Sequence, residues 1–74
     1  MTEFYQRITE FLKEYLEIPD DFFRPDGILK PVAAALCLRY LMQNEVFKDW
    51  QELQQEAYKE YGVMIPKTAM EGFQ

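Results

Sequence analysis

Neither histidine nor serine occurs among the 74 residues of this chain. Without them the protein cannot form a Ser-His or Cys-His catalytic pair, an imidazole metal site, a serine-attached carrier or a histidine switch near neutral pH. Carboxylates are plentiful, but most fall on the solvent faces of the helices described below, not in a cleft where two of them could divide acid and base roles. We therefore expect a protein that is not an enzyme and that uses no cofactor and no metal.

Cysteine is nearly absent as well, because Cys37 stands alone. A lone cysteine cannot form an internal disulfide, so a reducing compartment is expected. The first seven residues lack the basic start and apolar run of a signal peptide, and no apolar run reaches the roughly 20 residues that span a bilayer. These features predict a cytoplasmic protein without a membrane segment. No cation or helix N-terminus adjoins Cys37 to activate its thiol, which predicts a core cysteine.

Positive charge is scarce too, with 8 Lys and Arg against 13 Asp and Glu and a net charge of −5. This balance argues against electrostatic attraction to nucleic acid or to anionic lipid. Apolar residues, in contrast, make up 49% of the chain and aromatic residues 16%. Since a chain of this size buries only about 60% of its unfolded surface, either its core is dense or another chain covers some of its apolar surface.

Residues 31–43, which read PVAAALCLRYLMQ, predict the central helix of the fold. Pro31 suits the first helical position, where a missing N–H costs nothing. The helix is apolar on nearly every side, which is typical of a buried helix. Both of its polar residues fall on one narrow stripe, formed by Val32, Ala35, Arg39 and Gln43. We expect the rest of the circumference to be buried.

Two amphipathic helices are predicted on either side of this central helix. The first runs from Phe4 to Leu16, and Pro19 ends it at or before Ile18. The second begins at Asp49-Trp-Gln-Glu52, which resembles a capping box, and ends at Gly62. Its expected inner face comprises Trp50, Leu53, Gln54, Ala57, Tyr58 and Tyr61.

The segments between and after these helices predict turns and one short helical piece. We expect Asp20 to cap a single helical turn and Pro25-Asp26-Gly27 to form a tight turn. In the tail, Val63-Met-Ile should fold back on the bundle, and Pro66 should begin one or two helical turns. The chain 1–74 is thus predicted to be a single all-α domain, a three-helix bundle around a buried central helix with a short C-terminal helical turn.

Candidate partner-binding residues are aromatic, arginine or acidic. Phe22 and Phe23 lie in a connector, where they either plug the end of the bundle or form an exposed binding knob. Arg24 follows them directly, and aromatic and arginine side chains dominate binding hot spots. Trp50 and Phe73 join this set because each lies at an element end or in a connector and not in the middle of a helix face. An acidic ridge, either a solvated face or a docking surface for a basic partner, comprises Asp49, Glu52, Glu56 and Glu60.

The favoured function is a small protein-protein interaction module, an adaptor, inhibitor or regulatory subunit that acts by surface contact. Its partner is expected to be another protein, with a second copy of the chain as one candidate. The alternative rests on residues 54–71, QQEAYKEYGVMIPKTAME, which resemble a helix-turn-helix, in which a glycine follows the first helix and a second helix reads the DNA major groove. That resemblance implies a DNA-binding regulator. It ranks second because its recognition segment holds one base, Lys67, and follows an acidic helix face.

Overall fold

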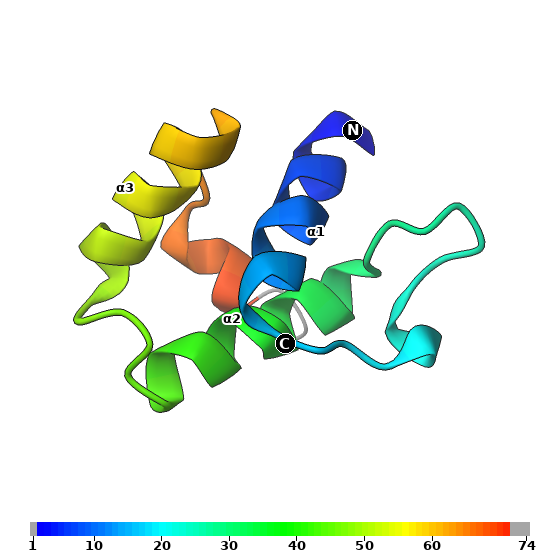
Figure 1. Ribbon diagram of the computed structural model, residues 1–74, viewed down its shortest axis with the longest axis horizontal. Helices are drawn as coiled ribbons and strands as arrows, with labels where there is room; N and C mark the ends of the chain where they lie inside the picture. Colours follow the sequence, from blue (N-terminus) through cyan, green and yellow to red (C-terminus); the bar gives the residue numbers. More distant parts are fainter. Residues whose placement is uncertain (1, 72–74) are drawn as a thin grey trace.

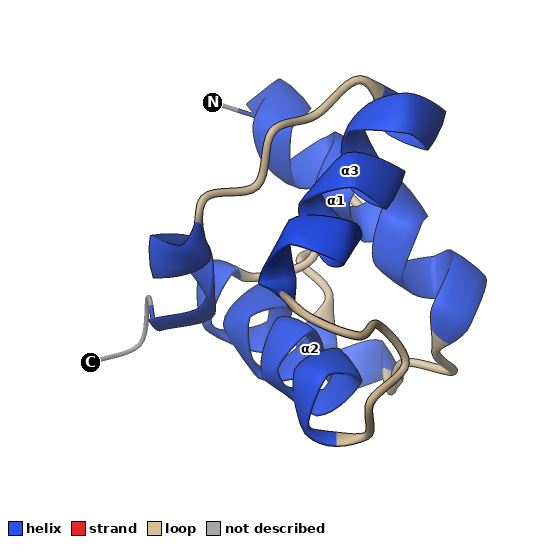
Figure 2. Cartoon of the chain, turned by 90° about the vertical axis from the view of Figure 1, so that its left-hand side faces the viewer, coloured by secondary structure: helices blue, strands red, loops and turns tan. Residues whose placement is uncertain are grey.

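The computed structural model describes residues 2–71 and shows an all-α fold, as the sequence predicts. Its elements are α1 (Thr2–Tyr15), the 3-10 helix η1 (Asp20–Phe22), α2 (Pro31–Gln43), α3 (Trp50–Tyr61) and the 3-10 helix η2 (Lys67–Glu71). In Figure 1, α1 and α3 stand side by side and antiparallel, and α2 crosses beneath α1. Figure 2 shows η2 alongside α2, against which it packs.

The core lies where the three α-helices meet. Fully buried side chains come from α1, α2 and α3, from the segment before α2 and from the segment after α3: Ile8, Phe11, Leu12, Leu29, Leu38, Leu41, Leu53 and Ile65. Phe47, in the loop before α3, stacks on Phe11 with ring centroids 6.0 Å apart. Both the return of the tail onto the bundle and the packing of helix 4–16 on the central helix are therefore confirmed.

The ends of the helices follow from local chemistry. α3 begins at a capped N-terminus, where the Asp49 carboxylate accepts a hydrogen bond of 2.9 Å from the Glu52 N–H. It ends at Gly62, whose φ of 66° is the left-handed conformation that glycine adopts freely. α2 ends in a Schellman motif, in which the Val46 N–H donates to the Leu41 carbonyl and the Glu45 N–H to the Met42 carbonyl. Glu45 occupies the left-handed position there, with φ of 56°.

The connector between α1 and α2 folds as a turn held by a buried threonine. The Gly27 N–H donates to the Arg24 carbonyl, which closes the predicted turn, and Phe23 and Leu29 form an isolated antiparallel bridge. The Leu29 N–H donates to the Thr9 hydroxyl at 2.9 Å, and that hydroxyl donates to the Tyr5 carbonyl at 2.6 Å. Thr9 thereby ties the segment before α2 to the middle of α1.

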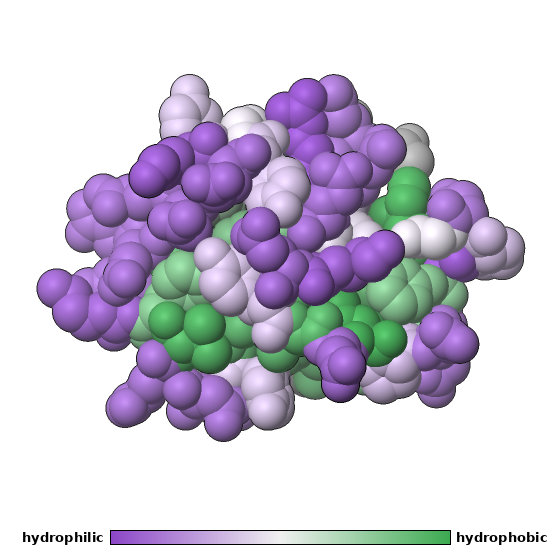
Figure 3. Space-filling view, in the orientation of Figure 1, coloured by the Kyte–Doolittle hydropathy of each residue, from purple (hydrophilic) through white to green (hydrophobic). Residues whose placement is uncertain are grey.

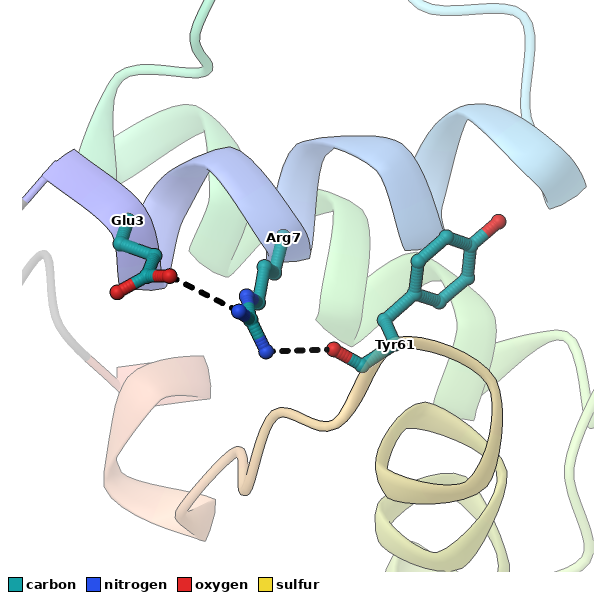
Figure 4. A network of polar contacts seen from close by, with 3 residues as sticks. All are labelled: Glu3, Arg7 and Tyr61. Carbon is teal, nitrogen blue, oxygen red and sulfur yellow. Dashed lines mark hydrogen bonds and ion pairs between the residues drawn. The ribbon is translucent and has the colours of Figure 1, made fainter.

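One arginine joins α1 to the end of α3. Arg7 donates from one guanidinium nitrogen to the Tyr61 carbonyl at 3.1 Å and from the other to the Glu3 carboxylate at 2.9 Å (Figure 4). The Tyr61 carbonyl belongs to the last turn of α3, where unpaired carbonyls give the helix terminus a partial negative charge. The guanidinium group therefore both satisfies an orphan acceptor and interacts favourably with the helix dipole.

Three expectations about faces and caps are wrong. The outward face of α2 departs from the predicted stripe, because Ala35 is fully buried and Leu36 is 43% exposed, although Val32 and Gln43 are exposed as predicted. Tyr58, placed on the inner face of α3, is 60% exposed. Asp20 is the first residue of η1, follows Pro19 at the N-cap, and caps nothing with its side chain. In the first two cases apolar or aromatic residues occupy both sides of the helix, so hydropathy did not fix which side faces the core.

None of the helices within residues 2–71 is both long enough and apolar enough to cross a membrane.

Candidate interaction surface

The exposed face of α2 is apolar. Val32, Leu36 and Tyr40 are 50%, 43% and 53% exposed, and their spacing of four residues places them in one row along the helix. Val46, just beyond the end of α2, is 44% exposed. Figure 3 shows the corresponding band of apolar surface across the lower part of the molecule, over α2, with hydrophilic surface above and below it. We call Val32, Leu36, Tyr40 and Val46 the α2 face.

A groove adjoins this face, between α2 and the extended segment that leaves α1. Its apolar lining comes from Leu16, Ile18, Pro19, Phe22, Leu36 and Tyr40. Glu17 and Arg39 contribute one charge of each sign to its lining, and Gln43 and Asn44 contribute amides. We call this hollow the α2 groove. Mostly apolar walls with a few polar groups are typical of concave binding sites.

Cys37 also lines the α2 groove, yet it is only 6% exposed. Burial raises the pKa of its thiol above the ordinary value of 9.0. The thiol therefore stays protonated at neutral pH, where only a thiolate would be a good nucleophile. The prediction of a buried, core cysteine is confirmed.

The predicted phenylalanine pair lies partly inside the fold. Phe22 and Phe23 are both half-buried and pack against the core. Phe22 lines the α2 groove, while Phe23 is covered by the Lys13 ammonium group, 5.9 Å from its ring centroid. Arg24 is exposed and pairs with Asp26 at 3.0 Å. The structure thus brings Phe22, but not Phe23 or Arg24, to the lining of the groove.

Trp50 does not line this groove. Trp50 is partly buried and packs against the core, and its indole N–H is buried without a hydrogen-bond partner among the described residues. An unpaired buried N–H costs free energy. The apolar contacts of the Trp50 ring with the core must therefore hold this side chain in place. Phe73 lies outside the described residues.

The acidic ridge divides into two parts with different surroundings. Asp49 and Glu52 are occupied at the start of α3, since the Glu52 carboxylate accepts from the Lys48 N–H at 2.8 Å while its own N–H donates to Asp49. Glu56 and Glu60 instead lie near α1, close enough to act on Tyr15. Two members of the ridge therefore have a structural role in capping, and two contribute to a negative surface between α1 and α3.

Two partly buried tyrosines, Tyr15 and Tyr61, lie beside that negative surface. Burial, reinforced by the charges of Glu56 and Glu14, raises the pKa of Tyr15 above its ordinary value of 10.0. Burial and the nearby carboxylate of Glu14 raise the pKa of Tyr61 in the same way. Both phenols are therefore neutral at physiological pH. The clustering of glutamates from two helices could not be read from either helix alone.

Other chemistry has little support in the residues that the structure describes. Within residues 2–71 there is no group of three or more His, Cys, Asp and Glu side chains that could hold a metal ion. Residues 54–71 do not form the helix pair of a helix-turn-helix. An extended stretch follows α3, and η2 is a five-residue 3-10 helix packed on α2.

Comparison with protein-family models, with curated proteins and with solved structures finds no match to this chain. The α2 face, the α2 groove and the negative surface between α1 and α3 are therefore the features from which a function is inferred.

The α2 face is the feature that sequence reasoning missed. The sequence did contain a signal for it, namely a central helix that is apolar on nearly every side in a short chain. A short chain provides too few neighbouring elements to cover such a helix on every side. Here α1 and η2 cover one side of α2, and the opposite side is left to solvent.

Proposed function

We propose that this chain is a small protein-interaction module, an adaptor, inhibitor or regulatory subunit, that binds its partner through the α2 face and the α2 groove and performs no chemistry. The observation that carries the proposal is the row Val32, Leu36 and Tyr40, exposed along one helix. Single exposed apolar residues are ordinary, but a contiguous apolar patch usually marks an interface. The groove beside the row adds a concave surface that an apolar side chain of a partner can enter.

Three further features support a role in contact without catalysis. The only thiol is buried and protonated. Histidine and serine are absent from the chain. The negative surface around Glu56 and Glu60 favours approach of a partner that carries positive charge at its rim, an effect that speeds association and weakens with salt. A lone reduced cysteine fits the reducing cytoplasm, where we expect the protein to act.

Affinity capture with two variants of the α2 face tests the proposal. Leu36→Glu and Tyr40→Glu place a charge in the apolar row and should each remove the bound partner from the captured set. Met64→Glu is the matched control, since Met64 is 58% exposed but lies after α3, away from the α2 face. If wild type and both α2 variants retain the same partners equally, the proposal is contradicted.

DNA binding is the alternative that the sequence raises, and no observation in the structure favours it as a second candidate. A gel-shift assay at low salt checks it directly, since electrostatic binding to DNA is strongest there. We expect no shift.

A further inference from the structure

The exposed row of α2 has the geometry of a helix-packing ridge. Val32, Leu36 and Tyr40 are spaced i, i+4 and i+8, and rows of this spacing interdigitate in the commonest class of helix–helix packing, with the axes crossing at about −50°. Such a ridge is complementary to another ridge of the same kind. The simplest partner for it is the same ridge on a second copy, because a two-fold axis apposes identical patches.

Charge favours the same occupant. The chain carries a net charge of −5, so two copies repel each other at most orientations. α1 contains Glu3, Glu10 and Glu14, and α3 contains Glu52, Glu56 and Glu60, whereas α2 contains no acidic residue and one basic residue, Arg39. Of the three α-helices, α2 alone can meet its counterpart without apposing carboxylates. The adjoining groove is balanced, with Glu17 and Arg39 in its lining, and so selects neither an acidic nor a basic partner.

We propose that the α2 face is the interface of a reversible homodimer, in which α2 crosses α2 of a second copy near Leu36. This inference rests on the proposed function, because it names the partner for the same surface. With a second copy as the partner, the negative surface around Glu56 and Glu60 keeps α3 out of the contact and does not attract a basic partner.

The accessible surface of a single copy indicates a reversible dimer and not an obligate one. The accessible surface is 4950 Å², and the scaling of surface with mass gives about 4,800 Å² for a folded monomer of 8.9 kDa. A single copy therefore exposes about as much surface as a folded monomer of its mass, and the proposed interface is confined to the α2 face and groove. An interface limited to one helix and its groove lies at the small end of specific interfaces, where association is weak and transient.

Sedimentation equilibrium across concentration, up to on the order of 1 mM, tests the dimer. Wild type should shift from monomer to dimer mass as concentration rises. Leu36→Glu should raise the dissociation constant by at least about tenfold, since a two-fold axis introduces the charge twice. Met64→Glu should leave the constant unchanged. Val32→Glu is a second variant in the same row, and circular dichroism confirms that each variant is folded.

Cross-linking tests the geometry. With a short bis-maleimide, Leu36→Cys should form cross-linked dimers efficiently, because its counterpart lies near the axis. Wild type, whose only thiol is the buried Cys37, and Met64→Cys should not. Equal cross-linking of Leu36→Cys and Met64→Cys, or a wild type that stays monomeric throughout, overturns the homodimer.

The outcomes separate this inference from the proposed function. If the protein is a strict monomer and Leu36→Glu loses the captured partner, the proposed function holds and the homodimer is contradicted. The α2 face then binds a different protein. A dimer that resists both Leu36→Glu and Val32→Glu uses another surface, and contradicts the inference. A monomer whose captured partners are unaffected by every α2 variant contradicts both.

Discussion

At the scale of single residues, Thr9 is the most informative polar group in the fold. It is 4% exposed, and its hydroxyl both accepts from the Leu29 N–H and donates to the Tyr5 carbonyl. Replacing it with valine keeps the shape and leaves the buried Leu29 N–H without an acceptor. We expect Thr9→Val to lower the free energy of unfolding by about 1–3 kcal/mol.

Urea denaturation measures this loss, and Thr9→Ser is the control, since it keeps the hydroxyl and removes one methyl group. The serine variant should lose about 1 kcal/mol or less. If valine proved as stabilising as threonine, the bond to Leu29 would contribute nothing.

Two leucines of α2 should respond differently to truncation, although their side chains are identical. Leu41 is fully buried, so Leu41→Ala should cost about 2–5 kcal/mol. Leu36 is 43% exposed, so Leu36→Ala should cost about 1 kcal/mol or less. Thermal melting of both variants checks the orientation of α2 about its own axis, and equal losses would show that the helix is turned differently.

At the scale of elements, the end of α2 contains a residue that does not suit its backbone. Glu45 takes the left-handed conformation of the Schellman motif, which costs an L-residue about 1–2 kcal/mol and costs glycine nothing sterically. Replacing Glu45 with glycine removes this cost, but part of the gain is offset by the greater conformational entropy of glycine in the unfolded chain. We expect Glu45→Gly to raise the free energy of unfolding by about 0.5–1 kcal/mol.

The matched variant for this test is Glu45→Ala, which removes the carboxylate but keeps the Cβ. It should show no gain. A stabilisation of equal size in both variants would attribute the effect to charge and not to backbone conformation.

The start of α3 offers the complementary test. Asp49→Ala removes the acceptor for the Glu52 N–H and should destabilise the protein by about 0.5–2 kcal/mol. Asp49→Asn retains an acceptor oxygen and should recover most of that loss. The urea midpoints of the two variants measure the difference, and if alanine matched asparagine the cap would be dispensable.

The bounds of α2 and α3 could be predicted because their ends depend on neighbours in sequence. Pro31, Asp49 and Gly62 each act within one turn, and the helices begin and end at them. The rotation of each helix about its axis could not be predicted in the same way. Leu36 and Leu38 have the same hydropathy, and only contacts with distant residues decide which one is buried.

At the scale of the whole molecule, the α1–α3 contact should make the fold sensitive to alkaline pH. The pKa values of Tyr15 and Tyr61 are raised in the folded protein by burial and by nearby glutamates. The folded protein therefore holds these protons to higher pH than the unfolded chain does. The resulting stability is fully present below pH 10 and is lost as pH rises above that value.

Urea titrations between about pH 8 and 11 measure this dependence. Tyr15→Phe keeps the ring contacts with Phe11 and Phe47 and should make the alkaline loss of stability shallower. Tyr58→Phe is the control, because Tyr58 is exposed. An alkaline loss that is as steep in Tyr15→Phe as in wild type would contradict the prediction.

The candidate surface was predicted less fully than the fold. Among residues 2–71, the aromatic and acidic candidates chosen from sequence are scattered over the structure, since Phe22 lines the α2 groove while Trp50 packs against the core. Leu36 and Tyr40 of the α2 face were assigned to the interior, whereas Val32 was placed on the outward stripe. In a chain with 49% hydrophobic residues, hydropathy alone does not show which apolar side chains are buried.

The bond between Arg7 and the Tyr61 carbonyl also has a consequence for how the protein is made. The two residues are 54 positions apart in the sequence. The packing of α1 against α3 likewise joins segments that are far apart in the sequence. At about 5–20 residues per second, a ribosome adds those positions in roughly 3–11 s. For that interval α1 has no α3 to cover Phe11, so this part of the core cannot form until residues 50–61 have been made.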